Sequence, residues 1–373
     1  MKKLIFKKIL TDILKFFLIV SFSLGLIVWV IQAVNFLDFV SEDGHSFRVY
    51  FLYTLLNIPK ILSRILPFVF FLSIFYIINK YENNNELLIF WNFGITREKF
   101  INTFFQFSLF FLFLQLLMTS IIVPFTQDKA RSFIRNSNID YFPSLVKEKM
   151  FIDTVTNLTI FVEKKNELGE YENIFLKDKI DKNISQIIYA KKGKFKVDEN
   201  SNILVLYDGE FLNRDGDQFN KFSFKTTEFN LSKYSTKSTT FPKIQELKTN
   251  LLFNCINSLD NKKKFSNAYL ECNERTVTTI KQEFLKRIYM PIYIPLLGLI
   301  CSFLILISKN DFNYSKKRLS IFLYATIILI FSEISLRYAT KMSHYIILFI
   351  PIFLFFLNYI IITKRAKLMK NNK

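Results

Sequence analysis

The stretch FFLIVSFSLGLIVWVIQAVNFL, residues 16–37, contains 22 residues and no charged side chain. A helix needs about 20 apolar residues to cross a hydrocarbon core about 30 Å thick. Residues 1–15 before it form a basic, amphipathic lead-in. A cleavable signal peptide is the alternative, but the apolar run is too long and has no small-residue cleavage site. The stretch therefore predicts a first transmembrane helix.

Five further apolar runs follow, and each is bounded by charged residues. They cover residues 50–79, 101–125, 288–308, 319–335 and 342–363. The second run carries Lys60 and Arg64 in its first half, so its strongest part is 65–79. We therefore predict an α-helical membrane protein with six transmembrane helices, three before and three after a polar middle segment.

The protein has 373 residues, of which 51% are apolar and 45 are Phe, and its formal net charge is +19. Such a charge is compatible with nucleic-acid binding. Outside the middle segment, however, most Lys and Arg residues flank apolar runs, where cations anchor helix ends and set their orientation. Anionic lipid head groups are therefore better partners, and no nucleic-acid partner is expected.

One side of the predicted membrane receives four segments that are rich in Lys and Arg. These are the N-terminus, the 80–99 stretch, the 309–318 stretch and the tail from Lys364. The other side receives the acidic loop 38–43, the middle segment and the short loop 337–341. Because positively charged segments stay in the cytoplasm, we predict a multi-pass membrane protein. Both termini are then cytoplasmic, and the large domain is extracytoplasmic.

The middle segment shows the period-two alternation of β-strands. Leu158, Ile160 and Val162 alternate with other residues, and 203–206 and 221–225 are further short runs. Their number and spacing favour a sandwich, a jelly roll or an open barrel. We therefore predict an inserted all-β domain at 126–283. Transmembrane helices 1–3 occupy 1–125, and helices 4–6 with the basic tail occupy 284–373.

Two details of the strands are predictable. The pairs and clusters Asp208-Gly209 and 214–217 indicate turns. The phase of the apolar residues slips between Phe224 and Phe229, which indicates a bulge.

The three cysteines have different environments. Cys301 lies inside an apolar run and is best explained as a small packing residue. Cys255 and Cys272 both lie in the middle segment, where a disulfide is one alternative if that segment faces an oxidising compartment. His45 and His344, the two histidines, are better explained as residues at the membrane boundary than as ligands. No metal site is predicted.

Catalytic patterns are absent from the sequence. The eight glycines contain no Gly-x4-Gly-Lys-Ser/Thr phosphate loop. No Ser/His/Asp or Cys/His constellation can be assembled. We therefore expect no enzyme activity and no cofactor bound by this chain.

The predicted cytoplasmic stretch 81–96 reads YENNNELLIFWNFGIT. Residues 86–93 predict a short apolar helix with an acidic start, closed by Gly94 in a capping position. Such a helix, near 82–94, can dock into a soluble ATPase. An interfacial helix that lies on the bilayer is the alternative, because Phe90 and Trp91 suit that position equally well.

The order of several short stretches resembles the LptF/LptG permeases of the lipopolysaccharide export ABC transporter. They are 28–32 with 37–40, Leu66-Pro67, 86–87 with 94–96, 158–162, 174–178, and 283–287 leading to Pro291. The Trp29-x-x-Gln32 and Leu37-Asp38 stretch is more similar to LptF. In place of a smaller, Ala-rich run, this chain has Trp91-Asn92-Phe93.

The resemblance implies a multi-pass protein of the bacterial inner membrane whose inserted domain is periplasmic and jellyroll-like. It also implies a transporter subunit without its own nucleotide-binding motif. Its implied partners are a cytoplasmic ABC ATPase dimer, which uses ATP, a paralogous LptG-like permease, a periplasmic bridge protein, an LptC-like membrane protein and lipopolysaccharide. The implied function is extraction of lipopolysaccharide from the inner membrane and its transfer to the bridge. Glu86, Leu87, Phe90 and Gly94 are then the expected residues of ATPase coupling.

Five cations near the outer boundary are candidates for contact with lipid phosphates or carboxylates. They are Arg48, Lys60, Arg64, Arg337 and Lys341. Snorkelling, or an ion pair with Glu333, is the alternative.

Three other functions stay open from the sequence. The first is a membrane scaffold whose periplasmic domain binds another envelope protein. The second is a membrane enzyme that acts on lipid or glycan, which would need clustered acid and base residues. The third is a lipoprotein-release type of permease, which usually has four spans.

Overall fold

The computed structural model describes most of the chain as two compact units. The described residues are 2–37, 46–136, 146, 148–155, 157–166, 170–179, 184–198, 201–215, 218–231, 243–260, 266–267, 270–272, 274–309, 311–338 and 344–371. The first unit, which we call the helical unit, comprises 1–29, 57–128 and 243–373. The second, the sheet unit, comprises 30–56 and 129–242.

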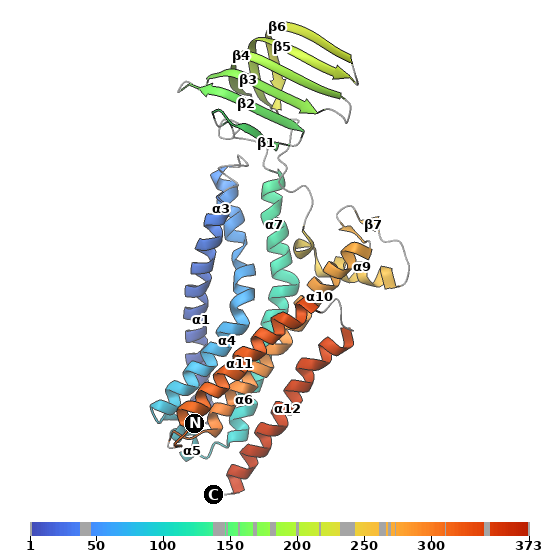
Figure 1. The fold of residues 1–373 in the computed structure, drawn as a ribbon. Helices are drawn as coiled ribbons and strands as arrows, with labels where there is room; N and C mark the ends of the chain where they lie inside the picture. Colours follow the sequence, from blue (N-terminus) through green and yellow to red (C-terminus); the bar gives the residue numbers. More distant parts are fainter. Residues whose placement is uncertain are drawn as a thin grey trace. The chain divides into compact units, whose positions relative to one another are not determined.

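Six segments of the described chain are long and apolar enough to cross a membrane, which confirms the predicted number (Figure 1). Their helices are α1 (Lys2–Asn35), α3 with α4 (Phe47–Leu56 and Ile58–Asn83), α6 with η1 and α7 (Arg97–Leu117, Met118–Ile122 and Val123–Asn136), α10 (Glu274–Ser302), α11 (Tyr314–Tyr338) and α12 (His344–Asn371). The protein is thus an α-helical membrane protein with an inserted β domain.

Helix α10 lies at the centre of the helical unit. In its membrane-spanning part 78% of the residues are buried, compared with 17% to 28% for the spans of α1, α6, α11 and α12. Its contact with α6 is close, because a Cβ added at Gly298 would lie 2.9 Å from the Cβ of Ser108. Helices that bury so little of their apolar surface leave the rest for lipid or for a partner.

The start of α1, the short helix α5 (Glu86–Asn92) and the end of α12 lie together at one end of the helical unit (Figure 1). The α10–α11 connection contacts the end of α4, which directly precedes α5, because the Glu82 carboxylate of α4 accepts a hydrogen bond from the Lys309 N–H at 3.0 Å. We call this end the basic end, since it carries the lysine-rich segments identified in the sequence.

Residues 243–272 belong to the helical unit, although they fall within the predicted insert. They form η3 (Ile244–Glu246), α9 (Thr249–Asp260) and the short strands β7 (Ser266–Asn267) and β8 (Leu270–Glu271). Cys255 and Cys272 form a disulfide here, which answers the question left open by the sequence. Leu252 and Cys255 of α9 pack with Ile280 of α10. This apolar contact explains why the segment joins the helices. In Figure 1 it lies at the opposite end of the unit from α5.

The described strands of the sheet unit form one six-stranded antiparallel sheet in sequential order, β1 to β6 (Figure 1). They are β1 (Phe151–Val155), β2 (Leu158–Lys165), β3 (Glu170–Lys179), β4 (Ile184–Asp198), β5 (Ser201–Asp215) and β6 (Gln218–Asn230). The alternation predicted in β2 is confirmed, with Leu158, Ile160 and Val162 buried on one face. The order is that of a meander, and the jellyroll detail stays a prediction.

The sequence of β6 shows a change of phase in its alternating apolar residues, and the same change occurs in the neighbouring strands β4 and β5. In β4 the buried positions change from Ile188 and Ala190 to Gly193, and in β5 they change from Leu206 to Gly209. The pairing of β4, β5 and β6 nevertheless keeps one register on both sides of the slip. A bulge would insert a residue and shift the register, so the bulge predicted between Phe224 and Phe229 is wrong.

Two residues with left-handed backbone conformation mark the line of the slip. Asn173 and Asp208 have φ of 49° and 48°, and the registers place both opposite Lys191, one on each side. The pair Asp208-Gly209 lies inside β5, so the turn predicted there is wrong. Gly209 is needed, because a Cβ there would lie 2.3 Å from the Tyr189 carbonyl oxygen. For the predicted turn 214–217, Asp215 pairs with Gln218, and 216–217 lie outside the described residues.

Candidate functional site

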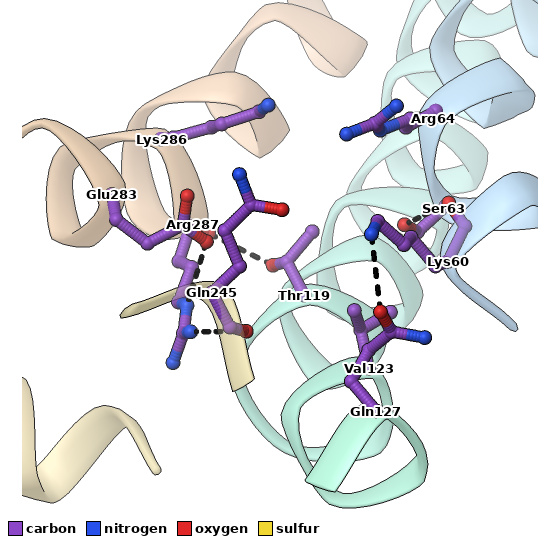
Figure 2. A pocket seen from close by; sticks show the side chains of 10 residues that line it. All are labelled: Lys60, Ser63, Arg64, Thr119, Val123, Gln127, Gln245, Glu283, Lys286 and Arg287. Atoms are coloured by element: carbon purple, nitrogen blue, oxygen red, sulfur yellow. Dashed lines mark hydrogen bonds and ion pairs between the residues drawn. The ribbon is translucent and has the colours of Figure 1, made fainter. Parts of the chain in front are cut away.

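A polar pocket of about 60 Å³ lies in the helical unit, where α4, the π-helix η1 with α7, η3 and α10 meet (Figure 2). We call it the cation pocket, because four of its lining side chains are basic: Lys60, Arg64, Lys286 and Arg287. Glu283 supplies its one lining carboxylate. A space of this size holds a few water molecules or one small polar group.

Lys60 is held by a chain of polar side chains. Its Nζ donates to Gln127 Oε1 at 3.1 Å, and Gln127 Nε2 donates to Asn57 Oδ1 at 2.8 Å. Asn57 and Gln127 are buried. An ammonium group has three donors, and this chain uses one of them. Lys60 is therefore positioned by the protein and keeps donors for another acceptor.

Arg287 is a structural cation. Its side chain is buried and donates to the Gln245 and Leu247 carbonyl oxygens at 3.0 and 2.9 Å, and to Thr249 Oγ1 at 2.9 Å. Its Nε also lies 3.3 Å from Glu283 Oε1. With these bonds Arg287 ties η3 and the start of α9 to α10. It also neutralises the carboxylate of the pocket.

The π-helix η1 forms a further wall of the pocket. Thr119 Oγ1 donates to the Arg287 carbonyl oxygen at 2.9 Å, and the Ser120 carbonyl accepts a bond from Thr249 Oγ1 at 2.5 Å. A π-helical turn often marks a functional site, because its extra residue leaves backbone groups without regular partners. Here the Ser120 carbonyl binds α9 and the Thr119 hydroxyl binds α10, and these contacts close one side of the pocket.

Arg64 and Lys286 stand on opposite sides of the pocket, and Figure 2 shows the ends of their side chains directed toward each other. Neither side chain has a hydrogen-bond or ion-pair partner among the residues that the structure describes. Two cations with free donors, beside a positioned Lys60, have the chemistry that an anion requires.

A second, larger cavity adjoins the cation pocket through Arg64. It measures about 470 Å³, and we call it the apolar groove. Pro67 and Phe68 of α4, Met290 of α10 and Leu329 of α11 line it. Because Arg64 lines both cavities, a ligand with an anionic group and an apolar part can occupy them together.

The five predicted cations fall in different places. Lys60 and Arg64 come together in the cation pocket. Arg48 is exposed on α3 and belongs to the sheet unit. Arg337 lies in α11, but its side chain is not described, and Lys341 lies outside the described residues, as do the loop 38–43 and His45.

Sequence reasoning missed Lys286 as a site residue. It lies in the stretch 283–287, which was used only for the resemblance. Its position just before a span, at the same end as Lys60 and Arg64, was the available signal. Glu333, the proposed ion-pair partner, lines the apolar groove with Arg64 but forms no ion pair with it within the described chain.

Helix α5 at the basic end is a second functional candidate, and its capping agrees with the prediction. Gly94 has φ of 63°. Its N–H donates to the Trp91 carbonyl, and the Ile95 N–H donates to the Phe90 carbonyl, both at 3.0 Å. This pair of bonds is a Schellman motif, so Gly94 ends the helix.

Two of the predicted coupling residues face the protein interior. Leu87 and Phe90 are buried at 1% and 2% exposure, and the Phe90 ring lies 5.3 Å from the ring of Phe100 in α6. They anchor α5 to the bundle, and their predicted role in ATPase coupling stays a prediction. A seven-residue helix contains only two turns, so its apolar period does not distinguish the buried face from the exposed one.

The exposed face of α5 carries other apolar side chains. Leu88, Ile89 and Phe93 are between 43% and 55% exposed. Glu86 at the start of the helix accepts a hydrogen bond from Asn84 Nδ2 at 3.1 Å, and its other carboxylate oxygen lies 4.0 Å from Lys8 Nζ. Leu88, Ile89 and Phe93, together with Glu86, form what we call the α5 surface.

Comparisons with known proteins match nearly the whole chain to one family. The family model described as lipopolysaccharide export system permease LptF/LptG matches residues 7–365. An uncharacterized protein of Rickettsia prowazekii (strain Madrid E) is 24% identical over 203 residues. That alignment covers 54% of this chain and 56% of the Rickettsia protein, so the chain spans a little over half the length of the curated relative that it matches.

Proposed function

Because the chain belongs to the LptF/LptG family of lipopolysaccharide export system permeases, we propose that it extracts lipopolysaccharide from the inner membrane and passes it to a periplasmic bridge. A separate ATPase supplies the energy. The chain contributes the lipid-binding surface and the mechanical connection to that ATPase.

The observation that carries this proposal is the shared position of Arg64. It lines both the cation pocket and the apolar groove. Lipopolysaccharide combines phosphate groups with several acyl chains. Phosphates suit Lys60, Arg64 and Lys286, since charge-assisted hydrogen bonds are among the stronger polar contacts in proteins. The acyl chains suit the surface around Phe68 and Met290.

The energetics of lipid transfer favour such a continuous surface. Moving acyl chains into water costs roughly 0.8 kcal/mol per CH₂. A lipid with several chains therefore cannot be released into water with the energy of a few ATP molecules. In the proposed mechanism the lipid passes from the groove to another apolar surface without full hydration, and the buried face of the β sheet is the next candidate.

We assign the ATPase contact to the α5 surface. Three exposed apolar side chains supply contact area, and the Glu86 carboxylate supplies a charge that an Arg of the partner can bind. Family membership supports the remaining partners that we propose. They are a second, paralogous permease, an LptC-like membrane protein and the bridge. The family match does not distinguish LptF from LptG, and we propose the LptF position from the stretch at 29–38.

Two features support a cytoplasmic basic end and a periplasmic opposite end. Lysine-rich segments gather with α5, and such segments stay in the cytoplasm. The disulfide between Cys255 and Cys272 lies at the other end, and disulfides persist in oxidising compartments such as the periplasm.

The proposal is tested in proteoliposomes that contain the chain with its partner subunits. We expect the triple variant Lys60→Gln, Arg64→Gln and Lys286→Gln to weaken lipopolysaccharide binding at least tenfold, because each hydrogen bond to a charged group contributes about 1.5–3 kcal/mol. Lipopolysaccharide-stimulated ATP hydrolysis falls with it. A charge-matched control removes three exposed cations of the basic end, by Lys15→Gln, Lys80→Gln and Lys316→Gln. Equal activity of the two triple variants would contradict the proposal.

A further inference from the structure

An open groove of about 550 Å³ lies in the helical unit between the first turns of α1 and the first half of α6. It shares no lining residue with the cation pocket or the apolar groove. Its residues Lys3 and Lys7 come from the start of α1, which lies at the basic end, where the neighbouring Lys8 approaches Glu86 of α5. We call it the lysine groove.

Three cations line this groove: Lys3 and Lys7 of α1 and Lys99 of α6. All three side chains are exposed. Within the described part of the chain none of them has a hydrogen-bond or ion-pair partner, and no Asp or Glu lines the groove. The neighbouring Lys8 differs, because it lies 4.0 Å from the Glu86 carboxylate. The groove therefore presents a net charge of about +3 that the protein itself does not neutralise.

Three apolar lining residues, Leu10, Leu14 and Phe107, are displaced along the helices from the charges. Leu14 follows Lys7 by seven residues and Phe107 follows Lys99 by eight. At a rise of 1.5 Å per residue these separations are about 10 and 12 Å. Leu10 lies between Lys7 and Leu14 on α1, whereas Phe6 is buried between Lys3 and Lys7. The groove thus has a charged end at the tips of the helices and an apolar part toward the middle of the spans.

Two hydroxyl groups lie between these parts, but they are already used. Thr11 Oγ1 donates to the Lys7 carbonyl at 2.7 Å, and Thr103 Oγ1 donates to the Lys99 carbonyl at 2.9 Å. The three lysines are therefore the remaining hydrogen-bond donors for a bound anion.

We propose that the lysine groove binds a phospholipid with an anionic head group, with the three lysines on the phosphate and the apolar part along one acyl chain. The order of charge and apolar surface along the helices is that of a phospholipid in a leaflet. A soluble anion would use the lysines alone and would leave the apolar part in water. Which leaflet is involved rests on the proposed function: with the basic end in the cytoplasm, it is the cytoplasmic leaflet.

The charges predict a preference among phospholipids. Each Lys near an anionic lipid surface contributes about 1 kcal/mol, which is about fivefold in affinity. Phosphatidylglycerol has a net negative charge, and phosphatidylcholine has none. We therefore expect the groove to select the former by at least tenfold.

The test uses the full chain, purified in detergent, with native mass spectrometry to count retained phosphatidylglycerol and phosphatidylcholine. We expect the chain with all three groove lysines changed to Gln to lose at least tenfold in phosphatidylglycerol affinity. The charge-matched control, Lys15→Gln with Lys80→Gln and Lys316→Gln, should retain it. Equal loss in both variants would show general surface attraction and overturn the proposal.

A second variant tests the apolar part without changing charge. Thr103→Trp places a large side chain in the groove and should reduce phosphatidylglycerol retention while all lysines remain. Unchanged retention would overturn the proposal. Lipopolysaccharide binding should be weakened by the cation pocket variants and unchanged in the lysine groove variants. The two proposals can therefore be contradicted independently of each other.

Discussion

Arg64 of α4 and Lys286 of α10 face each other across the cation pocket, and neither is paired with any described residue (Figure 2). Two like charges left in this way raise the energy of the empty site, and a bound anion relieves that repulsion. The neighbouring Arg287 is the opposite case, because protein groups occupy its guanidinium. Adjacent cations on one helix therefore have different roles, and variants can separate them.

The first prediction compares these neighbours. Arg287→Met removes the bonds to the Gln245 and Leu247 carbonyls and leaves the Glu283 carboxylate without its partner. We expect a loss of about 3–5 kcal/mol in stability, the usual effect of breaking a buried ion pair. Lys286→Met should leave thermal stability nearly unchanged and weaken lipopolysaccharide binding. Thermal unfolding in detergent measures the stability of each variant, and a lipid-binding assay measures its affinity for lipopolysaccharide. An Arg287→Met protein with wild-type stability would contradict the structural role of Arg287.

The second prediction separates the two faces of α5. Leu88→Glu or Ile89→Glu should abolish co-purification of the ATPase and leave the chain folded, because these side chains are exposed. Leu87→Ala or Phe90→Ala should lower the unfolding temperature, since truncation of a buried large apolar residue costs about 2–5 kcal/mol. Co-purification that survives both exposed-face variants would place the ATPase contact elsewhere.

The third prediction concerns Gly94, whose left-handed conformation ends α5. Gly94→Ala should cost about 1–2 kcal/mol, because an L-residue with a Cβ is strained there. Gly94→Asn should cost less, since Asn tolerates that conformation. ATPase affinity, measured by titration of the purified partner, should follow the same order: wild type, Asn, Ala. A Gly94→Ala variant with wild-type affinity for the ATPase would show that the helix cap does not contribute to ATPase binding.

The fourth prediction uses the disulfide as a marker of compartment. Cys301 is buried, and Cys255 and Cys272 are bridged. In intact cells, no thiol of this protein should therefore react with a membrane-impermeant maleimide until a reductant is added. Cys255→Ser should expose a free thiol at Cys272 without reduction. If Cys272 in that variant reacts only after the inner membrane is opened, the proposed orientation is wrong.

Much of the fold was predictable because the membrane imposes a strong and local rule. Runs without charge, such as residues 16–37, must be helical and about 20 residues long, and the six spans follow from this. Gly94 was predictable for a similar reason, since a glycine after a short apolar helix has one common use. The bounds of the helices beyond the apolar runs, as in α12 up to Asn371, depend on contacts that the runs do not contain.

The remaining features depend on tertiary contacts. The role of Arg287 is set by carbonyl groups about 40 residues away, which no local pattern reveals. The pair Asp208-Gly209 resembles a turn in sequence although it lies inside β5, because turns and residues with left-handed conformation in strands use the same residue types. The burial of Leu87 and Phe90 was not predictable, because a helix of seven residues has too few turns to show its orientation.

The central claim is that phosphorylated lipid binds between α4 and α10, with its phosphate near Arg64 and its chains near Phe68. The most direct measurement places a photo-crosslinking amino acid at Phe68 and, as a control, at the exposed Phe349 of α12. The account predicts lipopolysaccharide adducts at Phe68 that decrease when Lys60, Arg64 and Lys286 are changed to Gln, and only weak, variant-independent adducts at Phe349. Adducts of equal yield at both positions, or adducts at Phe68 that the three substitutions leave unchanged, would contradict it.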